Sequence, residues 1–84
     1  MFTGIVETQG LVHEIETDGS NIHFWIKSKI ASELKVDQSV AHDGVCLTVV
    51  EVKPELFRVT AIRETLLKTR IGSWQVGTAV NLER

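Results

Sequence analysis

The chain of 84 residues suffices for one small domain, residues 1–84, and is too short to bury a large core. Its 43% hydrophobic and 24% charged residues exclude a disordered chain, and a net charge of −2 without a Lys/Arg cluster argues against a nucleic-acid partner. One cysteine excludes an internal disulfide, and neither a signal peptide nor a membrane span is evident, so we expect a cytoplasmic protein with no membrane partner.

In the first half of the chain, apolar and β-branched segments predict strands separated by turns. We expect a first strand over residues 2–6, bent at Gly4, and a hairpin of residues 11–15 and 22–26 around an Asp-Gly turn. Period-two spacing predicts one face for Leu11 and Ile15, and the other for Val12. A short helix capped by Ser28 is expected to follow, through residue 34.

The second half predicts strands over residues 45–52, 56–62 and 79–82, and a short helix over residues 64–71 that ends at Gly72. The total is about six strands and two short helices, which is typical of an all-β barrel or sandwich. We favour a six-stranded closed barrel, because closure removes exposed strand edges.

Residues 39–52, SVAHDGVCLTVVEV, contain the strongest candidates for chemistry. The Asp43-Gly44 pair predicts a tight turn, and the alternation after it sets Cys46 and Thr48 on one face of a strand. A free cysteine is most often a small buried residue, whereas Cys46 beside a hydroxyl also suits the lining of a ligand site. A lining role is favoured over a nucleophilic one, because an ordinary thiol is mostly protonated at neutral pH.

For several other polar and aromatic residues, a structural role explains their presence as well as a functional role does. His42 is explained equally well by a structural hydrogen bond, and Glu64 by a favourable charge at the start of a helix. His13 and His23 are expected on the surface, and no metal-ligand spacing joins the histidines. The two tryptophans are expected to pack in the core or at an interface.

Three motifs together resemble the N-terminal half of riboflavin synthase: the opening MFTGIV, HDGVCLTV at residues 42–49, and ETL at residues 64–66. The resemblance implies a Greek-key barrel, the first of two in tandem. It also implies a transferase of riboflavin biosynthesis, which converts two molecules of 6,7-dimethyl-8-ribityllumazine to riboflavin and 5-amino-6-ribitylaminopyrimidinedione. No metal and no separate cofactor are implied, and the ligands are the lumazine and riboflavin.

By the same resemblance, two residues are candidates for the catalytic site and six for substrate binding. The catalytic candidates are Cys46 and Phe2, and the substrate-binding candidates are Thr48, Thr60, Ile62, Glu64, Gly4 and His42. An isolated domain is expected to bind ligand with little or no turnover, and to form a homodimer, whereas the two-barrel enzyme is implied to be a homotrimer. The alternatives are a non-catalytic chromophore-binding module of the lumazine-protein type and a barrel used for protein interaction.

Overall fold

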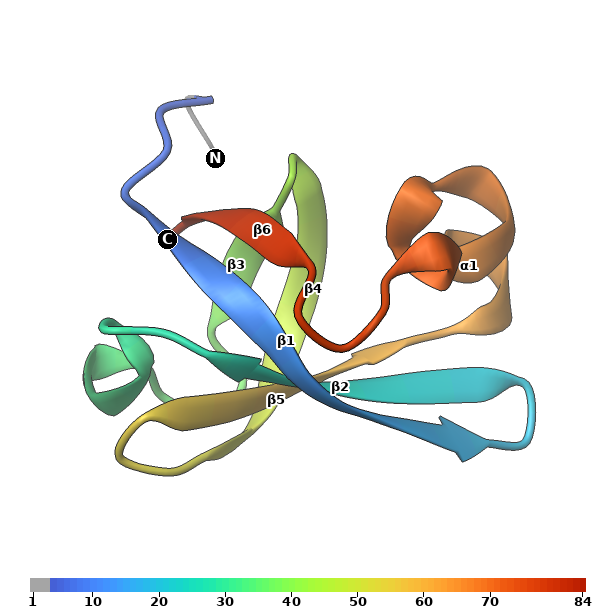
Figure 1. Ribbon diagram of the computed structural model, residues 1–84, viewed down its shortest axis with the longest axis horizontal. Helices are drawn as coiled ribbons and strands as arrows, with labels where there is room; N and C mark the ends of the chain where they lie inside the picture. The colour runs from blue at the N-terminus through green and yellow to red at the C-terminus, as the bar shows by residue number, and fades with distance from the viewer. Residues whose placement is uncertain (1–3) are drawn as a thin grey trace.

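The longest strand, β1 (Thr8–Asp18), closes a barrel because it pairs with a different strand over each of its halves. Its first residues pair with β6 (Ala79–Glu83), and the rest pair with β2 (Asn21–Lys27). The computed structural model describes residues 4–84. All neighbouring strands are antiparallel, in the order β1-β2-β5-β4-β3-β6, with β3 (Ser39–His42), β4 (Val45–Val52) and β5 (Leu56–Ala61) (Figure 1).

The order β5-β4-β3-β6 sets β6 beside β3, the first of three hairpin-connected strands, which is the Greek-key arrangement. The predicted all-β, six-stranded, closed Greek-key barrel is therefore confirmed. Closure pairs both edges of every strand in residues 4–84 with a neighbour over part of its length.

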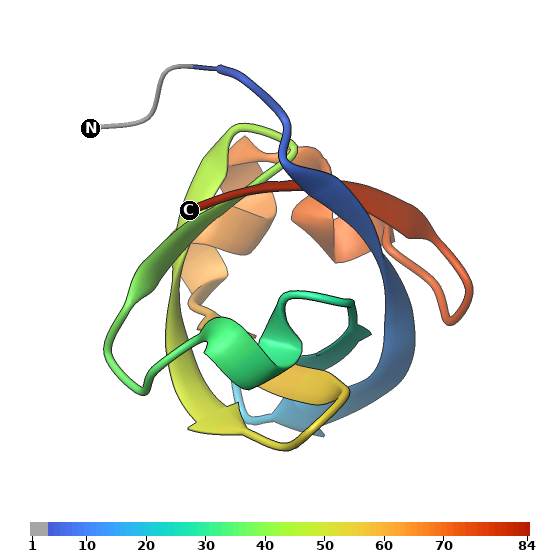
Figure 2. The same cartoon turned by 90° about the vertical axis from the view of Figure 1, so that its left-hand side faces the viewer.

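Short helical segments lie at the two ends of the barrel (Figure 2). One end carries the 3₁₀ turn η1 (Ala31–Glu33), and the other carries α1 (Arg63–Lys68) and the 3₁₀ turn η2 (Arg70–Ser73). Both predicted helical segments exist, but the first is only a three-residue 3₁₀ turn, whose N-cap is Ile30 and not Ser28, and the second is interrupted. Thr69 is extended there, and its hydroxyl accepts a hydrogen bond from the Ile71 N–H at 3.2 Å, so the chain restarts as η2.

Alternate residues of the strands fill the barrel with apolar side chains. Phe24, Phe57 and Val59 are at most 1% exposed, and Trp74 meets Phe24 edge-on with ring centroids 5.0 Å apart. The burial of Trp74 agrees with the packing role predicted for it. The wider core contains the following residues: Val12, Ile26, Ile30, Ala31, Leu34, Val40, Leu47, Val49, Ala61, Ile71, Val80 and Leu82.

The strand predictions for the first half of the chain need two corrections: one predicted strand is misplaced and one strand was missed. Residues 4–6 of the predicted first strand lie outside every strand, because β1 meets β6 only from the Thr8–Leu82 pair onward and Gly4 has a φ of +82°. The remainder of that segment lies outside the described residues. The prediction also missed β3, whose four residues show no alternation: Val40, Ala41 and His42 are all buried, since β3 lies between β4 and β6.

A β-bulge in β1 corrects the predicted faces of the first hairpin. The register against β2 shifts between Val12 and Glu14, so one extra residue enters β1 there. Val12 is 1% exposed in the core and Ile15 also packs against it, whereas Leu11 is 48% exposed. Leu11 and Ile15 therefore lie on opposite faces, contrary to the simple period of two.

Candidate functional site

Cys46 and Thr48 lie on the outer surface of β4. Both are exposed, whereas Leu47 and Val49 between and after them are 4% and 0% exposed in the core. Successive side chains of a strand point to opposite faces, and the apolar pair occupies the inner one. The predicted shared face is confirmed, and its exposure rules out the reading of Cys46 as a buried core residue.

The neighbouring strand continues this outer surface. β5 pairs with β4 as far as Val49 and Val59, and the next outward-facing residues along the chain from Val59 are Thr60 and Ile62. Thr60 is half-buried, and Ile62, which directly follows β5, is 52% exposed. The β4–β5 strip is our name for these four residues: Cys46, Thr48, Thr60 and Ile62.

Backbone polar groups accompany the side chains of the β4–β5 strip. Among the described residues, the β4–β5 ladder runs only as far as Val49, whose N–H and C=O bond to Gln38 and Asp37 on the β3 side at 2.9 and 2.8 Å. The backbone groups of adjacent residues in a strand face opposite edges of that strand. Because those of Val49 face β3, those of Thr48 face β5, and so do those of Cys46, two residues earlier. Amides and hydroxyls gathered in this way suit the polar edge of a flat heterocycle.

The Thr60 hydroxyl belongs to a hydrogen-bonded chain that crosses three strands. Its Oγ1 lies 2.7 Å from Nδ1 of His23, and Nε2 of His23 lies 3.1 Å from Oδ2 of Asp18. The side chain of His23 is only 18% exposed. His23 was predicted on the surface; it lies on the outer face of the barrel but is half-buried there, and its hydrogen-bond partner Thr60 is 37 residues away in sequence, beyond any local pattern.

Glu64 follows the strip in α1, the short helix that begins directly after Ile62. Its carboxylate lies 2.7 Å from Nζ of Lys68, one turn further along, and both side chains are exposed. The ion pair is that of a helix surface and contributes little to stability. It leaves a carboxylate and an ammonium group at the end of the barrel next to the strip.

The other predicted binding residues line a hollow at the α1 end of the barrel. Gly4 and His42 are among the lining residues of this hollow of about 710 Å³, together with parts of the β3–β4 turn, η2 and β6. Val45, which precedes Cys46 in β4, also lines the hollow, and so does Lys68, which is ion-paired with Glu64 in α1. The hollow therefore adjoins the β4–β5 strip at the α1 end of the barrel. Phe2 lies outside the described residues.

His42 is a buried neutral imidazole. It is 0% exposed, its Nδ1 donates to the carbonyl oxygen of Val40 at 2.9 Å, and its ring lies 5.6 Å from that of Phe57. Burial lowers the pKa of His42 to about 4, against the smaller raising effects of the Val40 hydrogen bond and of Asp43. Its Nε2 has no hydrogen-bond partner in the described part of the chain. The structure thus holds the His42 side chain in the core, apart from the outer β4–β5 strip.

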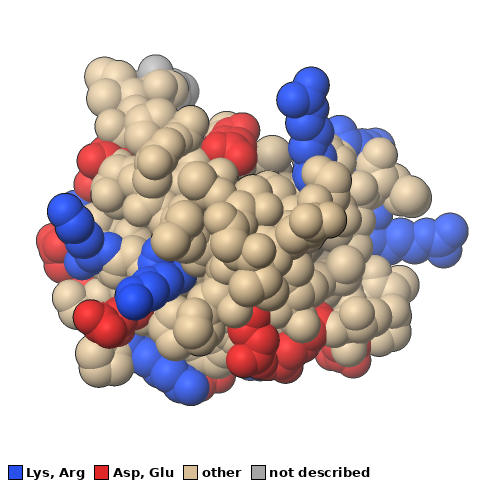
Figure 3. Space-filling view, in the orientation of Figure 1, with Lys and Arg blue, Asp and Glu red and all other residues tan. Residues whose placement is uncertain are grey.

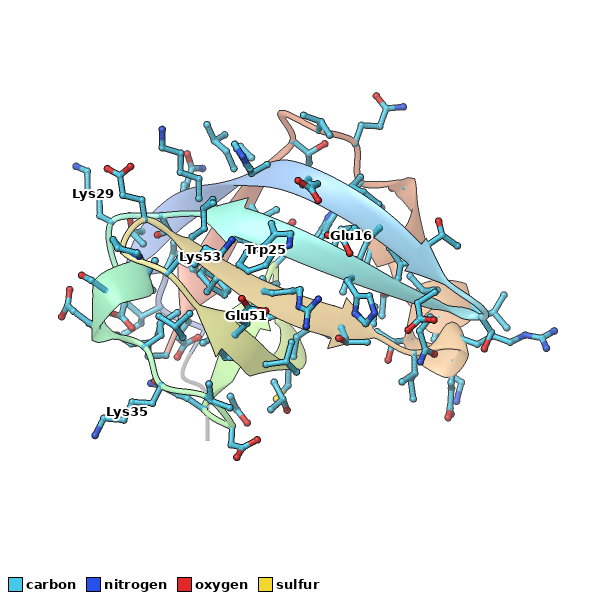
Figure 4. The ribbon with its side chains drawn as sticks, turned by 90° about the horizontal axis from the view of Figure 1, so that it is seen from below. Glu16, Trp25, Lys29, Lys35, Glu51 and Lys53 are labelled. Carbon is cyan, nitrogen blue, oxygen red and sulfur yellow. The ribbon has the colours of Figure 1, made fainter. Side chains whose placement is uncertain are left out.

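Trp25 is packed on the outside of the barrel rather than in its core. Lys53 lies over its ring at 4.5 Å, and its indole N–H donates to Glu16 at 3.3 Å (Figure 4). The guanidinium of Arg58 lies 5.6 Å from the ring centroid. Hydrogen bonds from Glu14 and from Trp25 hold the pKa of Glu16 below its ordinary value. This covering leaves Trp25 only 8% exposed, in agreement with the packing role predicted for it.

Charges of both signs are mixed on the face of the barrel that the space-filling view shows (Figure 3). On the face in Figure 3, Lys and Arg lie among Asp and Glu around a broad uncharged area. Within residues 4–84, no three His, Cys, Asp or Glu side chains cluster as metal ligands would. No helix in that range has the length and apolar character to span a membrane.

Comparison with known proteins identifies relatives along the whole chain. The lumazine binding domain family model matches residues 3–84. Riboflavin synthase of Saccharomyces cerevisiae is 40% identical over 92 residues, covering 100% of this chain and 39% of the relative. Riboflavin synthase of Bacillus amyloliquefaciens is 38% identical over 85 residues, with 100% and 40% covered. The chain therefore spans about two fifths of the length of these curated relatives.

Solved structures of LumP share the fold. LumP complexed with 6,7-dimethyl-8-(1'-D-ribityl) lumazine has a TM-score of 0.89 and 26% identity, covering 99% of this chain and 47% of that one. LumP complexed with flavin mononucleotide has a TM-score of 0.91 and 25% identity, with 99% and 48% covered.

Proposed function

The chain belongs to the lumazine binding domain family, and we propose that it is the N-terminal, ligand-binding half of a riboflavin synthase. The observation that carries the proposal is identity of 38–40% along the whole chain to riboflavin synthases more than twice as long. Its ligands are 6,7-dimethyl-8-ribityllumazine and riboflavin, and the proposed binding surface is the β4–β5 strip.

Each proposed contact follows from the chemistry of the strip. The flat ring lies along β4 and β5, where the exposed hydroxyl of Thr48 and the half-buried one of Thr60 reach its polar edge, and Ile62 covers its apolar part. Cys46 lines the ring as a soft apolar neighbour. The ribityl chain extends toward α1, where Glu64 accepts hydrogen bonds from its hydroxyls.

Two further residues are proposed to act at the edge of the site. Gly4 and His42 lie at the α1 end of the barrel, where the hollow adjoins the strip. Because the imidazole of His42 is in the core, its proposed contribution is to hold the turn that begins β4. Phe2 remains a candidate for the catalytic site of the complete enzyme.

The complete enzyme is proposed to hold two lumazine rings face to face and to move a four-carbon unit from one to the other. One product is riboflavin, and the other is 5-amino-6-ribitylaminopyrimidinedione. Proximity and orientation of the two rings supply much of the rate. One barrel holds one ring, so this domain alone is expected to bind ligand and to make riboflavin slowly or not at all. Incubation with the lumazine, followed by flavin absorbance, measures this directly.

A non-catalytic chromophore-binding module is the second candidate, because the solved structures that share this fold are LumP complexes. Identity to these structures is 25–26%, below the 34–40% to riboflavin synthases, which favours the synthase. Joining the chain to a riboflavin synthase C-terminal barrel distinguishes the two: restored turnover supports the synthase, and tight binding without turnover supports the module.

We also propose that the isolated domain forms a homodimer, and that the two-barrel protein forms a homotrimer. Exposed apolar side chains near the strip support a partner there, with Ile62 52% and Leu67 73% exposed. Two copies in a symmetric dimer bring two strips together in place of two different barrels. Sedimentation at tens of micromolar, roughly the usual working range, is expected to show a dimer, and a monomer contradicts this proposal.

Fluorescence titration with riboflavin tests the binding proposal. The unmodified chain is expected to quench flavin fluorescence saturably, and Thr48→Val to weaken binding by about threefold to tenfold, which is the cost of one hydrogen bond. Thr8→Val is the matched control, because β1 lies three strands from β4 around the barrel in either direction. Absence of binding by the unmodified chain, or equal effects of both substitutions, contradicts the proposed site.

A further inference from the structure

Asp18, His23 and Thr60 form a relay of side chains on the outer face of the barrel. They come from β1, β2 and β5, and the two contacts measure 3.1 Å for Asp18 Oδ2 to His23 Nε2 and 2.7 Å for His23 Nδ1 to Thr60 Oγ1. The side chain of Asp18 is 69% exposed, while that of His23 is 18% exposed. The relay thus runs from solvent to the half-buried hydroxyl of the β4–β5 strip.

The carboxylate fixes the direction of the hydrogen bonds. An ionised Asp18 only accepts, so Nε2 of a neutral His23 carries the hydrogen and its Nδ1 is left as an acceptor. The Thr60 hydroxyl then donates its one hydrogen to Nδ1. Its oxygen keeps lone pairs and has no hydrogen to offer elsewhere, so toward a ligand it acts as an acceptor.

We propose that His23 and Asp18 are positioning residues that hold the Thr60 hydroxyl as a hydrogen-bond acceptor and so select a ligand that presents a hydrogen there. This role rests on the proposed function of the β4–β5 strip. The flavin ring carries a single N–H, in its imide group, and the ribityl chain carries hydroxyls. Both are donors that match the fixed acceptor, whereas a ring carbonyl at this point is rejected.

A double-mutant cycle on riboflavin affinity tests the relay. At pH 7.5, His23→Phe is expected to weaken binding by about threefold to tenfold in the unmodified chain and to have no effect in a Thr60→Val background. His13→Phe, on an exposed histidine of β1, is the matched control and leaves the affinity unchanged. Asp18→Ala removes an exposed side chain and is also expected to weaken riboflavin binding. It replaces His23→Phe in the cycle if that variant does not fold.

A ligand analogue gives a readout that a purely structural role does not move. With 3-methylriboflavin, which lacks the imide N–H, loss of the His23 effect assigns the ring as donor, and its persistence assigns the ribityl chain.

Two results overturn the relay while leaving riboflavin binding intact. One is an equal effect of His23→Phe with and without the Thr60 hydroxyl, and the other is no effect in either background. Failure of the unmodified chain to bind riboflavin overturns the proposed function and the relay together.

Discussion

Acid sensitivity of the folded state follows from His42 and can be worked out in size. In the unfolded chain an exposed imidazole has a pKa near 6.5, whereas burial lowers the pKa of His42 to about 4 in the folded protein. Between pH 6.5 and about 4 the imidazole therefore binds a proton in the unfolded state but not in the folded state. The free energy of unfolding has its full value above pH 6.5 and decreases as the pH falls toward 4. At about 1.36 kcal/mol for each unit, the loss amounts to about 3 kcal/mol.

Urea unfolding between pH 7.5 and 4.5 measures this effect. His42→Phe keeps an aromatic ring beside Phe57 and Trp74 but does not titrate, so its stability is expected to fall less with acidification than that of the unmodified chain. His13→Gln, at an exposed position, is expected to keep the unmodified slope. If His42→Phe shows the same slope as the unmodified chain, the buried-imidazole explanation is refuted.

Three further substitutions and one chemical reaction have defined outcomes. Gly10→Ala sets a Cβ 2.6 Å from Cγ2 of Ile26, so we expect about 1–2 kcal/mol of destabilisation by urea unfolding, and no loss contradicts the close approach. The Asp43 carboxylate accepts a hydrogen bond from the Asn81 N–H at 2.7 Å, and the φ of Asp43 is 50°. Asp43→Ala is therefore expected to lower the free energy of unfolding by about 1–2 kcal/mol, and Asp43→Asn by less than about 0.5 kcal/mol. Equal losses of stability contradict this explanation. Cys46 should react with a maleimide in the folded state and more slowly with riboflavin bound, and unprotected reaction argues against a ligand-lining thiol.

The alternation of apolar and polar residues predicted a strand correctly where that strand's own residues determine which side faces the core. The β4 alternation of Val45–Val52 located both its strand and its outer face, because Leu47 and Val49 must face the core. The first strand was misplaced because β1 pairs with β6 only from Thr8–Leu82 onward, and this tertiary pairing, not local composition, decides where the strand begins.

Long-range contacts account for the features that the sequence did not predict. The strand character of β3 comes from its pairing with β4 and β6, not from its four residues. The bulge between Val12 and Glu14 changes the faces of β1, and nothing in the local pattern marks it. Likewise, the contact of His23 with Thr60 joins residues of β2 and β5 that become neighbours only when the barrel closes.

Mapping of riboflavin binding by amide chemical shifts tests the central claim most directly. In a titration of the ¹⁵N-labelled chain, the largest changes are expected at residues 46–50 and 60–64, along the β4–β5 strip and the start of α1. Amides of β1 and β6, across the barrel, are expected to move little. Changes centred on the hollow around Asp43 and Arg70, with the strip unaffected, would contradict the account.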